Sequence, residues 1–540
     1  MGGEGLYTGV SKTLTSQAFG LGPSSPVKKG RGNSIWNGCG TRYVPDGVTS
    51  KTQRNRESRI FNLEEGRNCW RVSRARRASL VVDACDYFRL ARKAMLKARS
   101  QIIMMGWDID TRVTLDEPQG KGEPPVKVGA LISWIAKKRP DLNIYILAWD
   151  GEAYRYLGRG TTLFQLGSWK RRKNIHFKLD HNHPREASHH QKILVIDDRL
   201  AFCGGIDITG SRWDTREHKD EPSKRREPTT HRSYQPWHDA IMAVDGGVAH
   251  CLGDLARLRW LAATGERLES ANPGEGDHWP EELEPDFRDV DIAIARTRGE
   301  VPDWSEIREI EALFLDLIAT ARRFVYIETQ YFASRVVAEA IGRRLGEPDG
   351  PEFVIVNPKA GFGWLDVSVL GPARAELVKA LERRDRYGRF RIYTPVTEAG
   401  ADIYVHAKIM VVDDHVLRVG SANLNNRSMG LDSECDLMID ARLPGNEGSV
   451  ATIKRLRADL IAEHLGVAPA EVAASCEKTG SLIATIERLR GEGRTLMPYE
   501  IPDFSAPLKA VAKSEALDPE SATDPFEPLA RRRLLRGFRK

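Results

Sequence analysis

Residues 404–429 read YVHAKIMVVDDHVLRVGSANLNNRSM, and the fold expected for the chain follows from this stretch. His406 and Lys408 are two positions apart, and in an extended strand this spacing places both side chains on one face. Apolar runs precede and follow Asp413 and Asp414, whose side chains favour a turn. The stretch therefore predicts two strands joined by a tight turn, with a histidine and a lysine side by side on the first strand.

The same pattern occurs earlier in the chain, at a constant offset of 216 residues. The matching positions are His190, Lys192, Asp197, Gly204 and Asp207, which correspond to His406, Lys408, Asp413, Gly420 and Asn423. A constant offset without a gap indicates an internal duplication, because repeats of this kind are usually copies of one structural unit. We therefore expect two halves of similar fold, each contributing one His-x-Lys pair.

Helical and strand-like patterns alternate around both units. The first half has strand-like segments at 101–115, 143–149 and 175–179 and helical patterns at 80–99 and 127–138. The second half has strand-like segments at 324–332, 353–356 and 390–393 and helical patterns at 304–322, 336–345 and 374–382. This alternation predicts an α/β fold with a mixed sheet in each half.

Composition divides the chain into two expected repeats, a linker and two flexible ends. The expected boundaries are 1–70 for a basic, Gly- and Ser-rich extension, 71–265 for the first repeat, 266–300 for the linker, 301–466 for the second repeat and 467–540 for a C-terminal extension with a basic tail. The extensions lack a persistent hydrophobic period, which is typical of disordered segments. The linker is acidic and contains prolines, which favours a connection rather than a domain.

Three shorter segments carry separate expectations. Within the linker, residues 290–295 predict one strand. Residues 211–232 are charged and have no hydrophobic period, so we expect a surface insertion there. The basic tail at 531–540 contains leucines and a phenylalanine, and two interpretations remain: contact with an anionic membrane surface, or a solvated terminus.

Charge and cysteine usage bound the class of protein. A net charge of +6 over 540 residues is too small to indicate a nucleic-acid partner, although it favours anionic surfaces. The seven cysteines are scattered without a C-x-x-C pair, which favours a reducing compartment. No apolar run approaches the roughly 18 residues of a membrane helix. We expect a cytoplasmic monomer; peripheral membrane binding and secretion by a signal-less route remain open.

The residue types of the two units fit the cleavage of a phosphodiester. If the units face one another, one imidazole can attack phosphorus while the other protonates the leaving oxygen. The two lysine ammonium groups would neutralise charge on the non-bridging oxygens. This chemistry needs neither a metal nor another cofactor, and we expect none.

Strand alternation separates the aspartates of the motif from its histidines. Asp197 and Asp413 belong to the candidate catalytic motif, but each lies an odd number of positions from its histidine and so points to the opposite face. We interpret both as structural residues at a strand end. Other carboxylates must then orient the imidazoles, and Asp239 and Glu434, at strand edges downstream of the two units, are the candidates.

Five further residues are candidates for substrate contact. Asn423 and Ser421 are expected near the pocket from the geometry of the second turn, whereas Asp207, at the matching position, is less suited to an anion. Glu328 and Gln330 share strand parity and are candidates to line the pocket, with an ordinary strand end as the alternative.

Two clusters near the motifs have competing interpretations. The histidines at 181, 183, 189 and 190 suggest a metal site, but no partner stands at ligand spacing and a loop is favoured. Asp108 and Asp110 are candidates for the mouth of the site, together with Trp107, for which packing is the favoured role.

The paired H-x-K-x(4)-D units, followed by G-G-x-D and G-S-x-N, resemble the phospholipase D superfamily. The runs PWHD at 236–239, YIETQYF at 326–332 and DSE at 432–434 resemble more specifically its phosphatidylcholine-hydrolysing branch. The likeness covers roughly residues 75–466. Two residues depart from the pattern: Asp207 and Thr329 stand where the family often has Asn.

The resemblance implies a fold of two α/β/α repeats packed about a pseudo-twofold axis, with the site at their interface. By position, it implies that His190 is the nucleophile that forms a phosphohistidine and that His406 is the general acid. The residues implied to bind phosphate are Lys192, Lys408 and Asn423, and those implied to hold the imidazoles are Asp239 and Glu434.

The function implied by the resemblance is hydrolysis of phosphatidylcholine-like phospholipids, at a membrane surface, to phosphatidic acid and the headgroup alcohol. Transfer to short alcohols is expected to accompany hydrolysis, because alcohols can attack the same intermediate. The alternatives are a phospholipid synthase of the cardiolipin or phosphatidylserine type, a nuclease of the same superfamily, and a lipid-binding scaffold without activity. A nucleic-acid substrate is disfavoured by the branch-specific runs.

Overall fold

The structure, a computed structural model, describes residues 61–118, 120, 122–152, 159–272, 276–361, 370–502, 504 and 518. The expectations for residues 1–60 and for the basic tail at 531–540 lie outside these residues. None of the described helices is both long and apolar enough to cross a membrane.

The first half alternates strands and helices, as expected. Its elements are β1 (Arg71–Val82), α2 (Ala84–Lys97), β2 (Gln101–Gly106), α3 (Val128–Lys138), β3 (Asn143–Trp149), η1 (Asp150–Glu152), α5 (Thr162–Trp169), β4 (Ile175–Asp180), β5 (Ile193–Ile196), β6 (Leu200–Gly204), β7 (Trp237–His238), β8 (Ala240–Asp245) and α6 (Gly247–Thr264). One prediction here was wrong, since residues 80–82 end strand β1 instead of beginning a helix. The strand was missed because polar residues alternate along its more exposed part.

The second half repeats this order. Its elements are β9 (Phe287–Arg298), β10 (Ile307–Arg308), α7 (Glu309–Thr320), β11 (Phe324–Glu328), α8 (Arg335–Leu345), β12 (Glu352–Val356), α9 (Gly371–Arg384), β13 (Phe390–Val396), β14 (Tyr404–Val405), β15 (Ile409–Val412), β16 (Val416–Gly420), α10 (Asn426–Gly430), β17 (Glu434–Asp440), α11 (Ser449–Leu465), α12 (Pro469–Thr479), α13 (Leu482–Leu489) and β18 (Thr495–Pro498).

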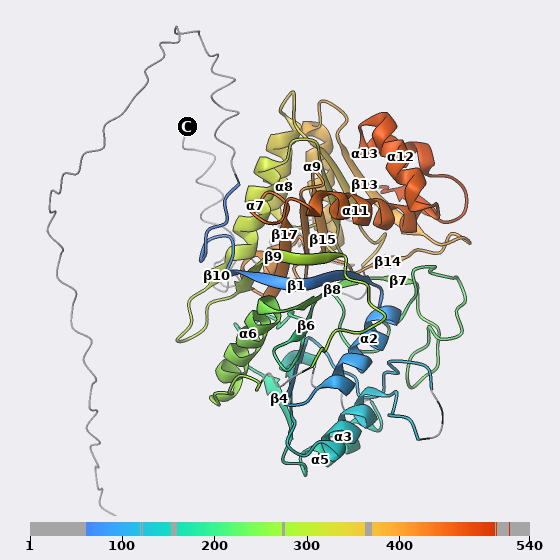
Figure 1. The fold of residues 1–540 in the computed structure, drawn as a ribbon. Coiled ribbons are helices and arrows are strands. Elements are labelled where there is room, and N and C mark those ends of the chain that lie inside the picture. The colour runs from blue at the N-terminus through green and yellow to red at the C-terminus, as the bar shows by residue number, and fades with distance from the viewer. Residues whose placement is uncertain are drawn as a thin grey trace, which may run out of the picture. The chain divides into compact units, whose positions relative to one another are not determined.

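The strand order confirms the duplication. Sixteen of the described strands form one sheet, in which the first half runs β1-β8-β6-β5-β2-β3-β4 and the second runs β9-β17-β16-β15-β11-β12-β13. Strands β7 and β14 pair with each other in a separate two-stranded sheet. In each half the first four pairings are antiparallel and the last two are parallel. Strands β1 and β9 pair antiparallel where the halves meet, with Ser73 opposite Ile292, and they lie side by side in Figure 1. The two halves are therefore related by a pseudo-twofold operation.

Helices cover both faces of the sheet. Along β1, Leu80 and Val82 belong to the hydrophobic cluster that includes α6 and α11, whereas Val81 belongs to the cluster of α2 and α3. Along β9, Ile292 joins the first of these clusters and Ala293 joins a third, which contains α7 and α8. Since successive strand residues point to opposite faces, each half is an α/β/α sandwich.

The expected domain boundaries differ from the structure in two places. Residues 287–298 of the expected linker form the central strand β9, because seven of these twelve side chains are buried in the sheet. Residues 469–498 of the expected C-terminal extension form α12, α13 and β18, and β18 pairs with β13. The apolar faces of α12 and α13, which include Val472, Leu482 and Ile486, complete the core. Their short amphipathic pattern was overlooked in the sequence.

The expected surface insertion at 211–232 is only partly exposed. Asp214 and His218 are fully buried, and Arg225 is nearly so. Arg225 donates to both carboxylate oxygens of Asp214 at 3.1–3.3 Å, so these charges are compensated inside the protein. The segment had no hydrophobic period because it packs through ion pairs rather than apolar side chains.

Candidate active site

The two motif histidines meet where the halves join. The ring centroids of His190 and His406 are 6.5 Å apart, and both rings line a cleft of about 620 Å³. Neither histidine lies inside its predicted strand, since β5 begins at Ile193 and β15 at Ile409. Each instead precedes the strand in an extended segment held by the opposite half: the backbone N–H of His190 donates to Ser433 and that of His406 to His238.

Each imidazole is held by a carboxylate from the other half. Nδ1 of His190 lies 3.0 Å from both carboxylate oxygens of Glu434, and Nδ1 of His406 lies 2.6 Å from Oδ2 of Asp239. With Nδ1 on the carboxylate, Nε2 of each ring is directed away from it, and this is the nitrogen available for reaction or proton transfer. Each half-site is therefore incomplete without the other half.

The two lysines lie buried beneath the imidazoles. Lys192 Nζ donates to the carbonyl oxygen of His190 at 2.8 Å and pairs with Asp207 at 3.1 Å. Lys408 Nζ donates to the carbonyl oxygen of His406 and lies 3.4 Å from Oε1 of Gln330. Two buried ammonium groups next to a cleft form a suitable environment for a phosphate group, whose negative charge would offset their burial.

Burial and positive charge shape the protonation of the site. Burial, reinforced by the two lysines, holds the pKa values of His190 and His406 well below the ordinary imidazole value. Burial lowers the pKa of Lys408 to about 7. A neutral imidazole is the nucleophilic form, and a bound phosphate would raise these pKa values through its negative charge.

The carboxylate of Glu434 is strongly basic for its type. Burial raises its pKa to about 8, although the hydroxyl groups of Ser421 and Ser428 donate hydrogen bonds to it. The contact of Glu434 with Nδ1 of His190 fixes the orientation of the ring and directs Nε2 away from Glu434. Burial also raises the pKa of Asp239, and the positive charge of Lys408 is the largest effect that opposes this shift.

The aspartates of the motifs lie at strand ends and not in the cleft. The carboxylate of Asp197 accepts the backbone N–H groups of residues 99, 100 and 101, and that of Asp413 accepts those of residues 322, 323 and 324. Both residues have positive φ, 51° and 54°, which aspartate tolerates in turns. The structure thus places both in a structural position and gives no support to a catalytic contact.

Three of the candidate substrate-contact residues line the cleft, namely Asp207, Gln330 and Asn423. Ser421 does not, because its hydroxyl donates to Glu434 and its position on the turn faces that carboxylate. Glu328 is also absent from the cleft: it accepts from His238 at 2.7 Å and lies 3.2 Å from His464. The prediction that Glu328 and Gln330 point to the same face was wrong, because β11 ends at Glu328 and the alternation of side chains does not extend to Gln330.

The mouth of the cleft contains expected and unexpected residues. Trp107, Asp108 and Asp110 line it, as the sequence suggested, and Trp107 stacks on Trp149 with centroids 5.7 Å apart. Asp108 is paired with Arg159, which donates to Oδ1 at 2.7 Å and also contacts Oδ2.

The sequence interpretation missed the cationic and aromatic wall of the cleft. Its main members are Trp149, Arg159, Arg212, Tyr331 and Tyr404. The guanidinium of Arg212 lies 4.2 Å from the ring centroid of Trp237, beside His406. Arg212 belongs to the segment that was interpreted as a surface insertion, so no signal in the sequence connected it with the motifs.

The cluster of histidines before the first motif does not converge on one point. His181 and His183 each contact Asp150, at 2.6 and 2.7 Å, whereas Nε2 of His189 pairs with Asp180 at 3.0 Å. The loop interpretation of this segment therefore agrees with the geometry.

Comparison with known proteins supports the assignment of the family. The phospholipase D family matches residues 94–273 and 391–489, just over half of the chain. Phospholipase D A of Dictyostelium discoideum is 24% identical over 488 residues, which cover 72% of this chain and 36% of that protein. Cardiolipin synthase 1 of Bacillus anthracis is 24% identical over 252 residues, covering 45% of this chain and 42% of that protein.

A solved structure, phosphatidylserine synthase from Haemophilus influenzae, superposes with a TM-score of 0.49 at 14% identity and covers 82% of this chain and 99% of that one. The chain spans only 28% to 63% of the length of the curated phospholipases D that it matches. Paired H-x-K motifs, a duplicated α/β/α sandwich and the matched residues agree: the chain belongs to the phospholipase D family.

Proposed function

We propose that the protein is a phospholipase D that hydrolyses phosphatidylcholine-like glycerophospholipids to phosphatidic acid and the headgroup alcohol. The observation that carries this proposal is the pair His190 and His406, 6.5 Å apart across one cleft, with each Nδ1 held by a carboxylate. This separation leaves room for a single phosphoryl group between the two reactive nitrogens.

In the first step, Nε2 of His190 attacks phosphorus and forms the P–N bond of a phosphohistidine. The bond between phosphorus and the headgroup oxygen breaks, and His406 gives its proton to that oxygen. In the second step, His406 takes a proton from water, the water oxygen bonds to phosphorus, and the P–N bond breaks. Lys192 and Lys408 offset charge on the non-bridging oxygens throughout, and the side-chain amide of Asn423 donates a hydrogen bond to one of them.

The second step accepts a short primary alcohol as well as water, because either hydroxyl can be deprotonated by His406. With an alcohol the product is a phosphatidylalcohol rather than phosphatidic acid. The aromatic side chains of the cleft, including Trp107, Trp149 and Tyr331, support a headgroup with a quaternary ammonium, which aromatic rings attract.

Contact with a membrane surface is supported by helix α5. Phe164 is 82% exposed and Leu163 46% exposed, and both lie close in the chain to Arg159, which lines the cleft. Exposed basic residues at 170, 171 and 173 follow the helix. Exposed aromatic and basic side chains at one site are typical of peripheral contact with anionic lipid.

The proposal is tested by incubating the protein with phosphatidylcholine vesicles and 1-butanol. We expect both phosphatidic acid and phosphatidylbutanol, and neither with His190→Ala or His406→Ala protein that retains its native circular dichroism. A folded wild-type protein that forms neither product from any glycerophospholipid would contradict the proposal. Replacing Phe164 by Ser should weaken turnover of vesicles and leave turnover of a soluble short-chain phospholipid unchanged.

A phospholipid synthase is the second candidate, favoured by the match to cardiolipin synthase 1. It would use the same phosphohistidine and a lipid hydroxyl as acceptor. Incubation with phosphatidylglycerol alone separates the two, since a cardiolipin synthase would form cardiolipin and glycerol, whereas a hydrolase would form phosphatidic acid.

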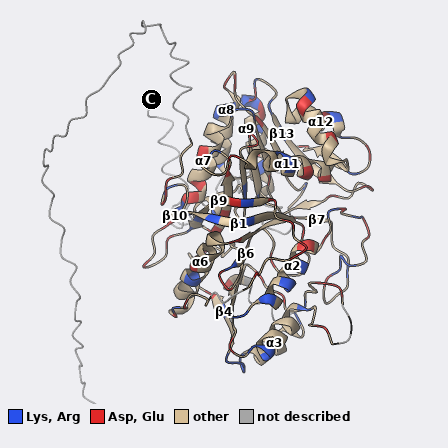
Figure 2. Ribbon diagram, viewed as in Figure 1, with Lys and Arg blue, Asp and Glu red and all other residues tan. Residues whose placement is uncertain are grey.

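A nuclease is less favoured, because acidic and basic residues are interspersed over the helices in the view of Figure 2. Nicking of a plasmid by the protein would reveal nuclease activity.

A further inference from the structure

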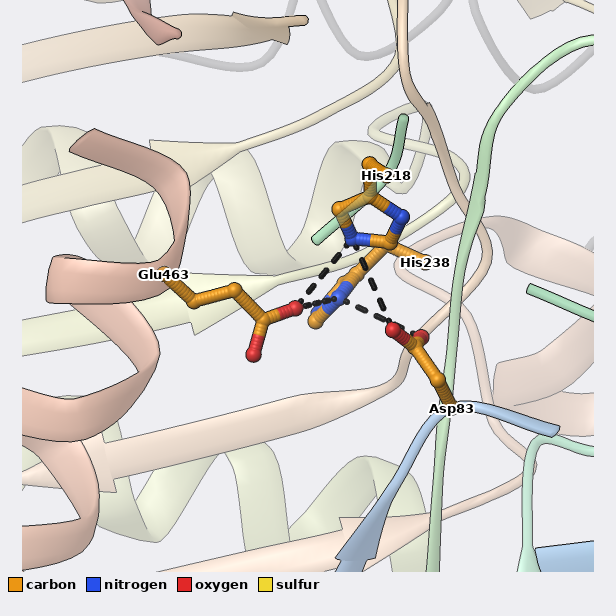
Figure 3. A group of neighbouring side chains, drawn as sticks. All are labelled: Asp83, His218, His238 and Glu463. Atoms are coloured by element: carbon orange, nitrogen blue, oxygen red, sulfur yellow. Dashed lines mark hydrogen bonds and ion pairs between the residues drawn. The ribbon is translucent and has the colours of Figure 1, made fainter. Parts of the chain in front are cut away.

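Four buried side chains from distant segments meet outside the catalytic cleft (Figure 3). They are Asp83, which follows β1, His218, from the segment between β6 and β7, His238, in β7, and Glu463, on α11. The two histidines are fully buried, and the side chains of Asp83 and Glu463 are 1% and 2% exposed. None of the four lines the cleft that contains His190 and His406.

The donor atoms lie close enough together to bind one metal ion, since all of them lie within 4.8 Å of one another. A zinc ion with ligands at its usual distances holds neighbouring donor atoms about 3.3 Å apart. Oε1 of Glu463 lies 2.9 Å from Nδ1 of His238 and 3.2 Å from Nε2 of His218. Each histidine is 3.6 Å from an oxygen of Asp83, Oδ1 for His238 and Oδ2 for His218.

An unsatisfied atom points into this cluster. Oδ2 of Asp83 is buried and accepts no hydrogen bond from any residue that the structure describes, and it lies 3.6 Å from Nε2 of His218. A buried carboxylate oxygen without a hydrogen bond is costly, and most are found to have a partner. Oδ1 of the same residue accepts the backbone N–H of Asp239 at 3.0 Å, which fixes the direction of the carboxylate.

The outer nitrogen of each imidazole faces a second carboxylate. Nδ1 of His218 is 3.1 Å from Asp214, and Nε2 of His238 is 2.7 Å from Glu328. Metal-binding histidines commonly donate their other N–H to a carboxylate in this way, which orients the ring and strengthens the ligand. The second oxygen of Glu463 is held by Arg216. The four candidate ligands are thus themselves held in place by Asp214, Glu328 and Arg216.

We propose that Asp83, His218, His238 and Glu463 bind one divalent metal ion of the zinc class. Two imidazole nitrogens and two carboxylate oxygens in a buried set of four suit zinc better than calcium or magnesium, which take six or more oxygen ligands or keep bound water. The ion would join β1, the segment between β6 and β7, and α11, and so connect the two halves. Since His238 directly precedes Asp239, the bound ion would also fix the position of the carboxylate that holds His406.

The test uses the full-length protein. The protein is unfolded in the presence of a chelator, dialysed, and refolded with either one equivalent of zinc or none. The zinc-refolded protein should retain about one ion per chain, and its melting temperature should exceed that of the metal-free protein by at least about 5 °C. Crystals measured at the zinc absorption edge should show one anomalous peak between the four side chains.

Two variants and a matched control complete the experiment. Asp83→Asn and His218→Gln should each lower zinc retention at least tenfold. His278→Gln removes another buried histidine, which donates to Asp197 at 2.7 Å, and should leave retention unchanged. A folded wild-type protein that retains less than about 0.1 ion per chain, or an anomalous peak at any other position, would overturn the proposal; the cluster would then be an ion-pair network of protonated histidines.

Discussion

The two half-sites share their framework but differ in charge. In the first half, Lys192 is paired with Asp207 at 3.1 Å. At the equivalent position of the second half stands Asn423, whose amide nitrogen lies 3.5 Å from Gln330 and whose Oδ1 is buried without a hydrogen bond. The charge of Lys192 is therefore compensated by a carboxylate. Lys408, at the equivalent position, lies 3.4 Å from the amide oxygen of Gln330 instead.

In the proposed mechanism, we therefore expect the two lysines to contribute unequally to phosphate binding. Burial lowers the pKa of Lys408 to about 7. We expect a bound phosphate to raise this pKa, because the anion stabilises the charged form of the lysine. The positive charge of Lys192 is offset by Asp207, so we expect Lys192 to contribute less than Lys408 to the binding of phosphate. The two half-sites therefore share a framework and differ in charge at the position of Asp207 and Asn423.

The largest expected effects come from removing either imidazole. His190→Ala and His406→Ala should each lower kcat at least about 10⁴-fold, because nucleophile and acid act as a unit. The two should differ with a substrate whose leaving group is a nitrophenolate, which needs no proton. His406→Ala should then show a burst of one nitrophenol per site, and His190→Ala none. Equal bursts would remove the asymmetry between the two histidines.

Exchange at the position that distinguishes the half-sites should give the next largest effect. Asn423→Asp places a carboxylate where phosphate is expected, beside Lys408, and should lower kcat/KM about 100-fold through charge repulsion. Asp207→Asn is the matched variant; it preserves an oxygen for the backbone N–H of Trp107 and should lower kcat/KM less than tenfold. Similar losses in both variants would show that the two half-sites bind phosphate equally.

The pH dependence of kcat/KM should follow the ionisation of Lys408. Its ammonium form binds phosphate, and its pKa in the free protein is about 7, so the fraction in the charged form falls as pH rises through 7. We expect kcat/KM to fall above that pH, while kcat, measured on the complex, falls only at higher pH because bound phosphate raises the pKa. Lys408→Arg, which stays charged, should move the alkaline limb of kcat/KM upward by at least one pH unit. An unmoved limb would assign the titration to another group.

The smallest effect on catalysis is expected from the aspartates of the motifs. Asp197→Ala and Asp413→Ala each leave three backbone N–H groups without their acceptor, which should lower the free energy of unfolding by about 2–4 kcal/mol. Below the melting temperature, kcat should stay within about threefold of wild type. Asp197→Ala should be the more destabilising, because His278 also loses a partner. A loss of kcat without a loss of stability would contradict the structural role.

The duplication and the motif histidines could be predicted from the sequence because both depend on spacing. A constant offset makes the two halves alike, and alternation in an extended segment places Asp197 away from His190. Alternation failed at Glu328, where the strand ends and the backbone changes direction. Burial of His218 could not be predicted, because its segment has no apolar period and packs through partners far away in the chain, such as Glu463.

The proposed mechanism requires a covalent phosphorus–nitrogen bond at one imidazole, and mapping that bond is its sharpest test. Wild-type protein is mixed with phosphatidylcholine labelled at phosphorus, quenched in alkali within milliseconds, digested and sequenced. The account predicts label on the peptide that contains His190, and no label in His190→Ala protein. Label on the peptide of His406, or an active protein that never carries label on an imidazole, would contradict it.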